Sequence, residues 1–240
     1  NDLVTGVQTC ALPILSYFKK MQIDIAVIEV GLGGNRDACA ALQPILSMVT
    51  NVTEDHLHIL GPTLKDVALN KSGLIFSGVP FYYGANDQFR ELFESRCNSV
   101  GAVFVPRKKM LRKTQSDLGG LHGELHWDSS WHKYRLNLRG DYQIQNLLSS
   151  LRLLSLLEEP LRPKAEDILK ALPGVTHACR LEIFSANPLV IIDGSHNQAG
   201  MKGLLSWLNK IIGKRKVFIA LGIKANKNHL EVAKLLEGWK

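Results

Sequence analysis

The sequence predicts an α/β protein in which helices cover a parallel sheet. From Leu15 onward, short apolar strand-like runs alternate with helix-like segments. The runs are apolar almost throughout, which is typical of parallel strands that are buried on both faces. Hydrophobic residues make up 45% of the chain, enough for a sizeable core, and no apolar run reaches the roughly 18 residues of a membrane span.

The first half of the chain supplies the predicted sheet and two helices. Four β-branched or aromatic runs are expected to be strands: Ile23–Val30, Ile45–Asn51, Val79–Tyr83 and Ala102–Val105. A helix is expected over Thr63–Ser72, because apolar residues recur there at helical spacing after a Gly-Pro-Thr start. Gln88–Ser99 is the second expected helix.

The second half begins with a predicted hairpin and an amphipathic helix. Residues 121–138 alternate in a strand-like way around a turn at Asp128–Ser130. The helix is expected over Asp141–Glu158, with five leucines facing inward: Leu147, Leu148, Leu151, Leu154 and Leu157.

A second α/β unit is predicted after three prolines, so we place a domain boundary near Gly174. The first domain then covers residues 15–173 and the second 174–240. The second domain is expected to contain, in order, strand Leu189–Asp193, helix Ala199–Ile212, strand Lys216–Leu221 and helix Lys227–Lys240. No sheet follows the last helix to close this domain, so we expect it to be incomplete.

The first 14 residues are excluded from the fold prediction. Val4–Ile14 reads as the translation of a sequencing-library adapter, and it lacks the basic n-region of a secretory signal. We therefore interpret residues 1–14 as a non-native leader.

Charge and cysteine content narrow the function classes. The formal net charge of +7 favours anionic partners without choosing among them. The densest basic cluster, Arg107–Lys113, has no interleaved aromatic residues, so we interpret it as a solvated face or loop and predict no nucleic-acid partner. Outside the leader, the cysteines are odd in number and show no C-x-x-C spacing, which favours a reduced cytoplasmic location.

Three residues of the first domain are candidates for a metal or phosphate site. Glu29 ends an apolar run, and a buried carboxylate there needs a cation, either a metal or a nearby Lys or Arg. His56 follows the second predicted strand, where α/β sheets place ligand-binding side chains. Lys71, near the end of a predicted helix, could meet a phosphate or simply satisfy the helix dipole.

The glycines after Glu29 allow the backbone to approach a bound group closely. They do not form a dinucleotide fingerprint, because the third glycine of G-x-G-x-x-G would fall at Arg36.

The second domain offers a second set of polar residues. Asp193 and His196 flank a Gly-Ser turn that leads into a helix whose N-terminus suits an anion. Arg180 could bind a phosphate through two hydrogen bonds.

In the hairpin of the first domain, three residues at alternate positions also suggest a metal site, but we interpret them as polar residues of a solvated hairpin: His122, Glu124 and His126.

Six motifs in this order resemble folylpolyglutamate synthase/dihydrofolate synthase, a branch of the Mur ligase superfamily. They are Ile28-Glu-Val-Gly-Leu-Gly-Gly34, Thr50-Asn-Val-Thr-Glu-Asp-His56, Asn70-Lys-Ser-Gly-Leu-Ile75, Gly140-Asp-Tyr-Gln-Ile-Gln-Asn146, Arg180-Leu-Glu182 and Asp193-Gly-Ser-His-Asn197. The resemblance covers almost all of residues 16–240. It implies a P-loop-type parallel-sheet domain, truncated at its N-terminus, followed by a partial Rossmann-like α/β C-terminal domain.

The resemblance also implies an activity, ligands and residue roles. The family uses ATP to activate a folate or dihydropteroate carboxylate as an acyl phosphate, which the amine of L-glutamate then attacks. By position, Glu29 and His56 would bind two Mg²⁺ ions, and Lys71 would be a catalytic lysine that is carbamylated. Gln143 and Asn146 would face the adenine. Arg180, Asp193 and His196 would reach the nucleotide and the transferred phosphate, the last two as catalytic residues. A cytoplasmic monomer without membrane or nucleic-acid partners is expected.

Departures from the family pattern limit what the chain itself is expected to do. A G-x-x-G-K-[ST] phosphate loop should precede Ser16 and is absent, and Gly213-Lys214 does not replace it because Arg215 follows. We therefore expect residues 1–240 alone to lack ligase activity. Asn35 stands where arginine is usual, Tyr142 replaces a frequent histidine and Cys179 a usual glycine. The alternatives are a peptidoglycan Mur ligase, with a UDP-muramoyl acceptor, and a non-catalytic α/β fragment.

Overall fold

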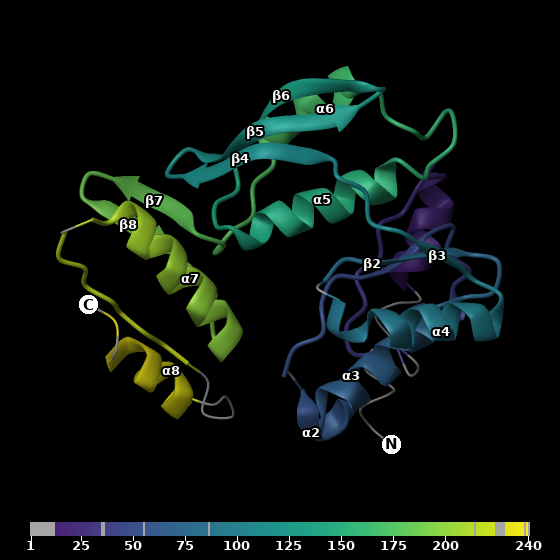
Figure 1. Ribbon diagram of the computed structural model, residues 1–240, viewed down its shortest axis with the longest axis horizontal. Coiled ribbons are helices and arrows are strands. Elements are labelled where there is room, and N and C mark those ends of the chain that lie inside the picture. The colour runs from purple at the N-terminus through teal and green to yellow at the C-terminus, as the bar shows by residue number, and fades with distance from the viewer. Residues whose placement is uncertain are drawn as a thin grey trace. The chain divides into compact units, whose positions relative to one another are not determined.

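The computed structural model describes residues 13–34, 37–54, 56–85, 87–213, 215–223, 229–237 and 239 (Figure 1). These residues fall into two compact units, residues 1–108 with 152–162 and residues 109–151 with 163–240. The predicted domain limits, 15–173 and 174–240, stay a prediction, because a compact unit is not by itself an independently folding domain.

A parallel sheet organises the first unit. Its strands are β1 (Ser47–Val49), β2 (Pro80–Tyr83) and β3 (Val103–Val105), in the order β1-β2-β3. Both pairings are parallel. Three of the four strands predicted for this half are thus confirmed, and so is the prediction of a mixed α/β fold with a parallel sheet.

Helical segments precede and connect these strands. Residues 13–21 are helical. The others are η1 (Ala38–Ala41), α2 (Leu57–Leu60), α3 (Leu64–Lys71), η2 (Ser72–Leu74), η3 (Asp87–Phe89) and α4 (Arg90–Val100). At the start of α3, Thr63 and Asp66 form a capping box in which each side chain accepts from the other's backbone amide, at 3.2 and 3.0 Å. This cap explains why the predicted helix begins where it does.

Aromatic packing forms the core of the first unit. Phe81 and Phe93 are fully buried, with ring centroids 5.5 Å apart, and Tyr83 lies 4.6 Å from Phe93. Ala68 of α3 and Cys97 of α4 belong to the same cluster. The helices are therefore fixed on the sheet by one continuous apolar cluster.

The prediction of a strand over Ile23–Val30 is wrong. Residues 25–30 have no regular secondary structure, and Val27 is 95% exposed. Apolar, β-branched composition favours a strand, but a strand also needs a hydrogen-bonded neighbour. No described strand pairs with this segment. The premise that Glu29 is buried inside a strand fails with it.

An antiparallel sheet begins the second unit. It consists of β4 (Leu111–Asp117), β5 (Gly120–Trp127) and β6 (Ser130–Leu136), in the order β4-β5-β6. The predicted hairpin is confirmed, since β5 and β6 join through Asp128 and Ser129, which both have positive φ as tight hairpin turns require. The strand β4 was missed: its first residues, Leu111–Lys113, had been interpreted as part of a solvated face or loop, and no strand was predicted over the rest.

The hairpin side chains that suggested a metal are engaged otherwise. Arg112 and Lys113 both pair with the carboxylate of Glu124, and hydrogen bonds from Lys113 and then Arg112 lower its pKa. His126 packs edge-on against Trp131 with centroids 5.1 Å apart. Among the residues that the structure describes, no group of three His, Cys, Asp or Glu could hold a metal ion. The ion pairs of Glu124 and the ring contact of His126 support the interpretation as polar residues of a hairpin.

The amphipathic helix is observed as α5 (Tyr142–Leu154). Leu147 and Leu151 are buried, whereas Leu148 and Leu154 are only partly buried. Further along, α6 (Ala165–Ala171) and η4 (Leu172–Gly174) pack against β6. The buried Trp127 ring donates to the Pro163 carbonyl at 3.0 Å and so ties this region to the sheet.

The last part of the chain departs from the predicted Rossmann-like arrangement. Strands β7 (Glu182–Ala186) and β8 (Leu189–Ile192) pair antiparallel, and two helices follow, α7 (Gln198–Ile211) and α8 (His229–Glu237). The predicted strand Lys216–Leu221 is wrong, since residues 215–223 are irregular and Phe218 is 95% exposed. As in residues 25–30, apolar composition without a pairing neighbour does not produce a strand.

Buried residues of α7 and α8 form the core here. Met201, Trp207 and Val232 are almost fully buried and cluster with Leu181, which precedes β7. Among the described residues, no helix is both long and apolar enough to cross a membrane.

Candidate functional site

The glycine loop after Glu29 packs tightly on the end of α3. A Cβ on Gly34 would lie 2.8 Å from the backbone oxygen of Asn70 and 3.1 Å from that of Lys71. Gly33 has φ +70°, and a Cβ there would lie 2.4 Å from the Asn70 side chain. Only glycine permits this approach without a shift. The loop is thereby held beside Lys71.

Lys71 connects the end of α3 to the segment that follows β1. Its Nζ donates to the carbonyl of Asn51 at 2.9 Å, and the side chain is partly buried. Asn51 opens the segment that ends at His56. Three predicted site segments thus meet around Lys71: the glycine loop, the end of α3 and the residues after β1.

His56 lies on the surface of the first unit as the N-cap of α2. Its backbone is left-handed, with φ 57° and ψ 32°, which is uncommon for a residue with a Cβ. The side chain is exposed, and its ring centroid lies 6.1 Å from that of His58. An exposed imidazole at a helix start can reach a ligand in solution. The preceding residue, Asp55, lies outside the described residues, as do Asn35 and Arg36.

Glu29 presents an exposed carboxylate at the entry to the glycine loop. An exposed carboxylate can reach a hydrated metal that phosphate oxygens also bind, and Mg²⁺ usually keeps several water ligands in such sites. The carboxylate of Glu29 therefore suits Mg²⁺, whereas the imidazole of His56 is a less usual ligand for this ion. The assignment of Glu29 and His56 as metal ligands stays a prediction.

Asp37 closes the glycine loop, a role that sequence reasoning missed. Its two carboxylate oxygens accept from the amides of Leu32 at 3.1 Å and Cys39 at 2.9 Å. Burial alone would raise the pKa of Asp37. Hydrogen bonds from the Cys39 thiol and from backbone amides at Cys39, Leu32 and Gly31 outweigh burial and lower it. An aspartate that caps a short helical turn just after a glycine loop was the available signal.

The Cys39 thiol is held in its protonated form. Burial, and then the hydrogen bond and charge of Asp37, raise its pKa to about 11. The sulfur lies 4.0 Å from the Glu29 carbonyl oxygen. Asp37 and Cys39 thus connect the backbone at Glu29 to the turn that follows the glycine loop.

We expect Asp37→Asn to lower the free energy of unfolding by about 1–2 kcal/mol at neutral pH, because one charged hydrogen-bond acceptor is lost. The folded-state pKa of Asp37 lies below the ordinary pKa of an aspartate, so its contribution to stability is complete above that ordinary pKa. The contribution is lost as the pH falls through the folded-state pKa. Urea unfolding from pH 7 to pH 2.5 should show the gap between wild type and variant closing in acid.

The exposed Asp24 supplies the control for this prediction. Asp24→Asn removes the same charge from the same unit without touching the glycine loop. A gap between wild type and Asp37→Asn that did not change with pH, or that Asp24→Asn reproduced, would contradict the role assigned to Asp37.

In the second unit, Asp193 ties two loops together. Its Oδ2 accepts from the Leu181 amide and its Oδ1 from the Ser195 amide, each at 2.9 Å. The amide of Gly194 donates to the Cys179 carbonyl at 2.7 Å. The carboxylate thus holds the loop after β8 against the loop that carries Arg180. Its predicted catalytic role stays a prediction.

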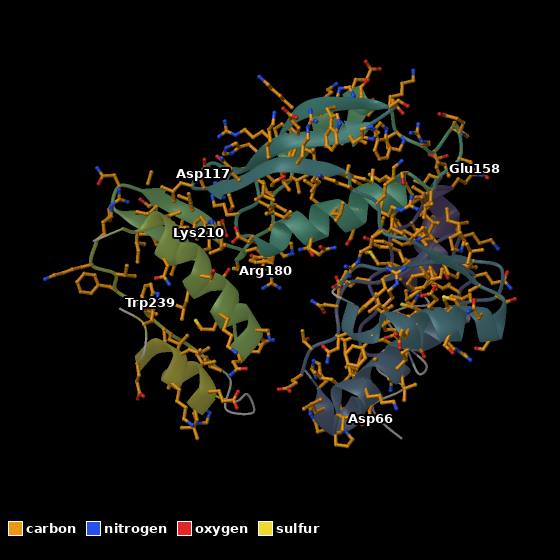
Figure 2. The ribbon with its side chains drawn as sticks, in the orientation of Figure 1. Asp66, Asp117, Glu158, Arg180, Lys210 and Trp239 are labelled. Atoms are coloured by element: carbon orange, nitrogen blue, oxygen red, sulfur yellow. The ribbon has the colours of Figure 1, made fainter. Side chains whose placement is uncertain are left out.

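Arg180, Asp193 and Tyr142 lie close to one another within the second unit. Arg180 stands between two left-handed residues, Cys179 at φ 56° and Leu181 at φ 48°, and a Cβ on Gly194 would lie 3.3 Å from its Nη1. Burial and then the charge of Asp193 raise the pKa of Tyr142, and the charge of Arg180 opposes them. The start of α5 therefore adjoins the Arg180 and Asp193 loops (Figure 2 labels Arg180).

Two predicted adenine contacts pair with each other on α5. The Asn146 amide donates to Gln143 Oε1 at 2.8 Å, with Gln143 5% exposed and Asn146 exposed. Residues three apart on a helix share a face, which explains the pairing. The buried Gln143 thereby fixes the exposed Asn146 amide.

His196 is exposed just before α7. Its Nδ1 lies 2.9 Å from the Gly194 carbonyl, which can only accept, so Nδ1 carries a proton and Nε2 is the acceptor of a neutral ring. Asn197 caps α7 by accepting from the Gly200 amide at 2.8 Å. Arg180, Asp193 and His196 thus lie in one loop region of the second unit. In the first unit, the glycine loop and the segment after β1 lie beside Lys71.

A family model and two curated proteins are similar to this chain in sequence. The family model of the Mur ligase middle domain matches residues 6–154. The folylpolyglutamate synthase of Lacticaseibacillus casei is 31% identical over an alignment of 234 residues that covers 90% of this chain and 52% of that protein. A Bacillus subtilis protein named dihydrofolate synthase/folylpolyglutamate synthase is 25% identical over 95% of this chain and 54% of its own length.

Solved structures of folylpolyglutamate synthase (FPGS) are similar to this chain in fold. An FPGS–AMPPCP–folate complex superposes with a TM-score of 0.83 at 27% identity, over 93% of this chain and 56% of that one. The apo form of L. casei FPGS gives a TM-score of 0.77 at 27% identity, over 93% and 55%. The chain spans about half the length of the curated relatives it matches.

Proposed function

Because this chain belongs to the folylpolyglutamate/dihydrofolate synthase family and carries a Mur ligase middle domain, we propose that it is part of an ATP-dependent ligase joining L-glutamate to folate or dihydropteroate. The observation that carries the proposal is the meeting of three site segments around Lys71. Because relatives are named for folylpolyglutamate synthase and for dihydrofolate synthase activity, both folate and dihydropteroate remain candidate acceptors. The experiment below distinguishes the two.

Glu29 and His56 are the residues that would hold two Mg²⁺ ions. Mg²⁺, when bound, supplies positive charge that neutralises phosphate oxygens during phosphoryl transfer. The protein's own part is to position these groups. The contact of Gly34 with α3 and the hydrogen bond from Lys71 to Asn51 support that role, because they fix the two segments that carry Glu29 and His56.

Carbamylation of Lys71 is part of the proposal. Carbamylation replaces the ammonium cation with an anion, which keeps one N–H that can donate to Asn51 and supplies oxygen atoms beside the glycine loop. ¹³C NMR of the active full-length enzyme in ¹³C-bicarbonate at neutral pH tests this directly, because a carbamate loses CO₂ in acid. An unmodified Lys71 in active full-length enzyme would contradict it.

Residues of the second unit are assigned to the nucleotide. Gln143 and Asn146 contact the adenine, and Arg180 pairs with phosphate oxygens as guanidinium groups do. His196 can accept a proton at Nε2. Asp193 accepts hydrogen bonds from two loop amides and so orients the loop that carries Arg180. We assign it this positioning role in addition to the proposed catalytic role.

The decisive experiment uses a purified full-length protein that contains this sequence, assayed without cell extract. Dihydropteroate, folate and a UDP-muramoyl substrate are offered separately with ATP, Mg²⁺ and candidate amino acids. Glutamate-dependent ADP release with either pteridine substrate supports the proposal, and turnover of the UDP-muramoyl substrate alone would replace it with a peptidoglycan Mur ligase. The expected catalytic form is a monomer, which light scattering during the assay checks.

Residues 15–240 by themselves are proposed to be inactive. They hold no Gly-Lys-Ser/Thr phosphate loop, whose backbone amides and lysine would cradle the nucleotide phosphates. Calorimetry with Mg-ATP tests this. Binding at the affinity of the full-length enzyme would show that the phosphate loop is dispensable and would contradict the proposal.

A further inference from the structure

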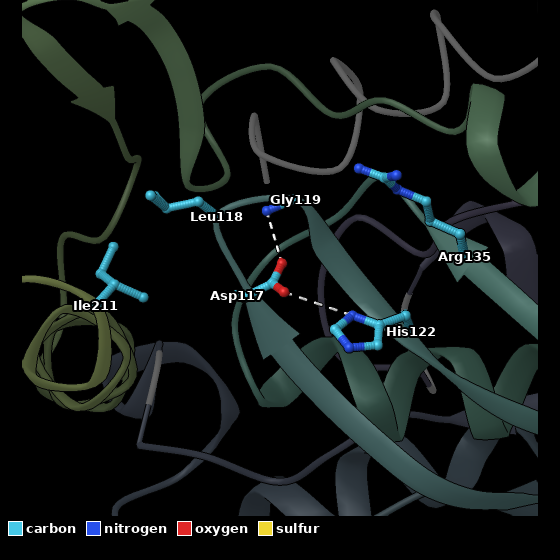
Figure 3. Close-up of a pocket in the computed structure, with 6 residues that line it drawn as sticks. All are labelled: Asp117, Leu118, Gly119, His122, Arg135 and Ile211. Atoms are coloured by element: carbon cyan, nitrogen blue, oxygen red, sulfur yellow. Dashed lines mark hydrogen bonds and ion pairs between the residues drawn. The ribbon is translucent and has the colours of Figure 1, made fainter.

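A cavity of about 580 Å³ lies within the second unit, and none of the residues that line it is assigned above to metal or nucleotide (Figure 3). It is lined by the β4–β5 turn, two strand residues and the last residue of α7: Asp117, Leu118, Gly119, His122, Arg135 and Ile211. We call it the turn pocket. Its volume falls within the roughly 300–1,000 Å³ of small-molecule sites.

The carboxylate in the turn pocket already has partners. Asp117 Oδ1 accepts from the Gly119 amide at 2.7 Å, and Oδ2 lies 3.7 Å from His122 Nδ1 (Figure 3). Asp117 thus closes the turn and faces the imidazole. The single acidic group of the pocket is directed at its own turn and at His122.

Arg135 brings positive charge to the same turn. A Cβ on Gly119 would lie 3.0 Å from Arg135 Nη2, so the guanidinium lies over the turn. Among the described residues, no carboxylate oxygen lies within 4.0 Å of it. A guanidinium group has five donors arranged to suit an oxyanion. Arg135 is therefore available to a ligand.

A second guanidinium group contacts the backbone of the same turn. Arg139 Nε donates to the Leu118 carbonyl at 2.7 Å. Burial lowers the pKa of Arg139, the charge of Asp117 raises it and the charge of Arg135 lowers it, so the two arginines feel each other's charge. Two guanidinium groups beside one carboxylate leave an excess of positive charge. Leu118 and Ile211 add an apolar wall.

We propose that the turn pocket binds a small organic anion, whose carboxylate or phosphate group pairs with Arg135 and whose apolar part packs on Leu118 and Ile211. The proposal does not depend on the ligase function. The excess positive charge selects an oxyanion, and the apolar wall favours an organic body over the bare ion.

The test uses the full 240-residue chain and three probes: phenyl phosphate, benzoate and inorganic phosphate. Chemical-shift titrations should show saturable binding of phenyl phosphate or benzoate at the amides of Gly119 and His122, and weaker binding of inorganic phosphate. Preference between the two organic probes identifies the anionic group. Shifts confined to the Arg180 loop, or no saturation at Gly119, would overturn the proposal.

Variants separate the turn pocket from general attraction to a basic surface. Arg135→Gln should weaken phenyl phosphate at least tenfold, and Arg135→Lys should weaken it less. Lys133→Gln removes the same charge from the same strand without lining the pocket, so it should change affinity less than twofold. Ile211→Ala should weaken phenyl phosphate but not inorganic phosphate. Equal effects of the Arg135 and Lys133 changes would overturn the proposal.

Discussion

Replacing Glu29 by glutamine in the full-length protein is expected to lower the turnover number for glutamate addition by at least about 100-fold. The neutral amide keeps the size of the side chain but loses the charge that attracts Mg²⁺. Glu29 is exposed, so the substitution should leave the free energy of unfolding almost unchanged. Steady-state ADP release across a range of Mg²⁺ concentrations measures the effect.

Glu91 provides the matched control, as an exposed carboxylate in the first turn of α4 in the same unit. Glu91→Gln should leave turnover within about twofold of wild type, since surface substitutions away from a site have small effects. Unchanged turnover of Glu29→Gln at limiting Mg²⁺ would contradict a metal-binding role for Glu29.

Replacing Gly120 by alanine is expected to destabilise the second unit by about 3 kcal/mol or more. Gly120 opens β5 with φ +107°, and an added Cβ would lie 2.2 Å from the Leu136 carbonyl oxygen and 3.2 Å from the Asn137 Cα. Both obstacles are backbone atoms, so no side chain can move aside. The pairing of β5 with β6 must shift instead. Chemical denaturation followed by tryptophan fluorescence measures the loss.

Gly213 separates the steric clash from backbone strain. It also has a positive φ, +57°, but a Cβ there would meet nothing within 4 Å. Gly213→Ala should therefore cost only about 1 kcal/mol. If both variants lost the same stability, the close approach of β6 to Gly120 would not be the cause.

Local signals carried much of the fold prediction. The capping box of Thr63 and Asp66 marks the start of α3 in the sequence, and the leucine face of α5 follows from helical spacing alone. Both depend on residues within a few positions of one another. Strands whose pairing strand is distant in the sequence were predicted less well, because the composition of a segment does not show whether a neighbouring strand is present.

Ile23–Val30 and Lys216–Leu221 show this limit. Each has strand-like composition, yet neither forms a strand in the described structure, and each exposes a large apolar residue, Val27 and Phe218. The reverse error occurred at β4, where a polar run beginning at Leu111 pairs with β5 and gains backbone hydrogen bonds that composition does not reveal.

The candidate site shows the same division. Lys71, Arg180 and His196 were named from motifs; the structure gives their contacts with Asn51, Gly194 and Gly194 respectively, and their roles stay predictions. Asp37 was missed because its importance comes from two backbone amides that approach it only after the glycine loop has turned. Asp193 was identified, but its contacts with two loop amides could not be foreseen from its position after β8.

The central claim is that Glu29 and His56 bind two Mg²⁺ ions in a shared pocket beside Lys71. The most direct measurement is anomalous diffraction from the full-length protein crystallised with Mn²⁺, a non-hydrolysable ATP analogue and folate. The account predicts metal peaks about 2.1 Å from a Glu29 carboxylate oxygen and about 2.1 Å from a His56 ring nitrogen, with the nucleotide phosphates between them. Metal peaks bound to the phosphates but remote from both side chains would contradict it.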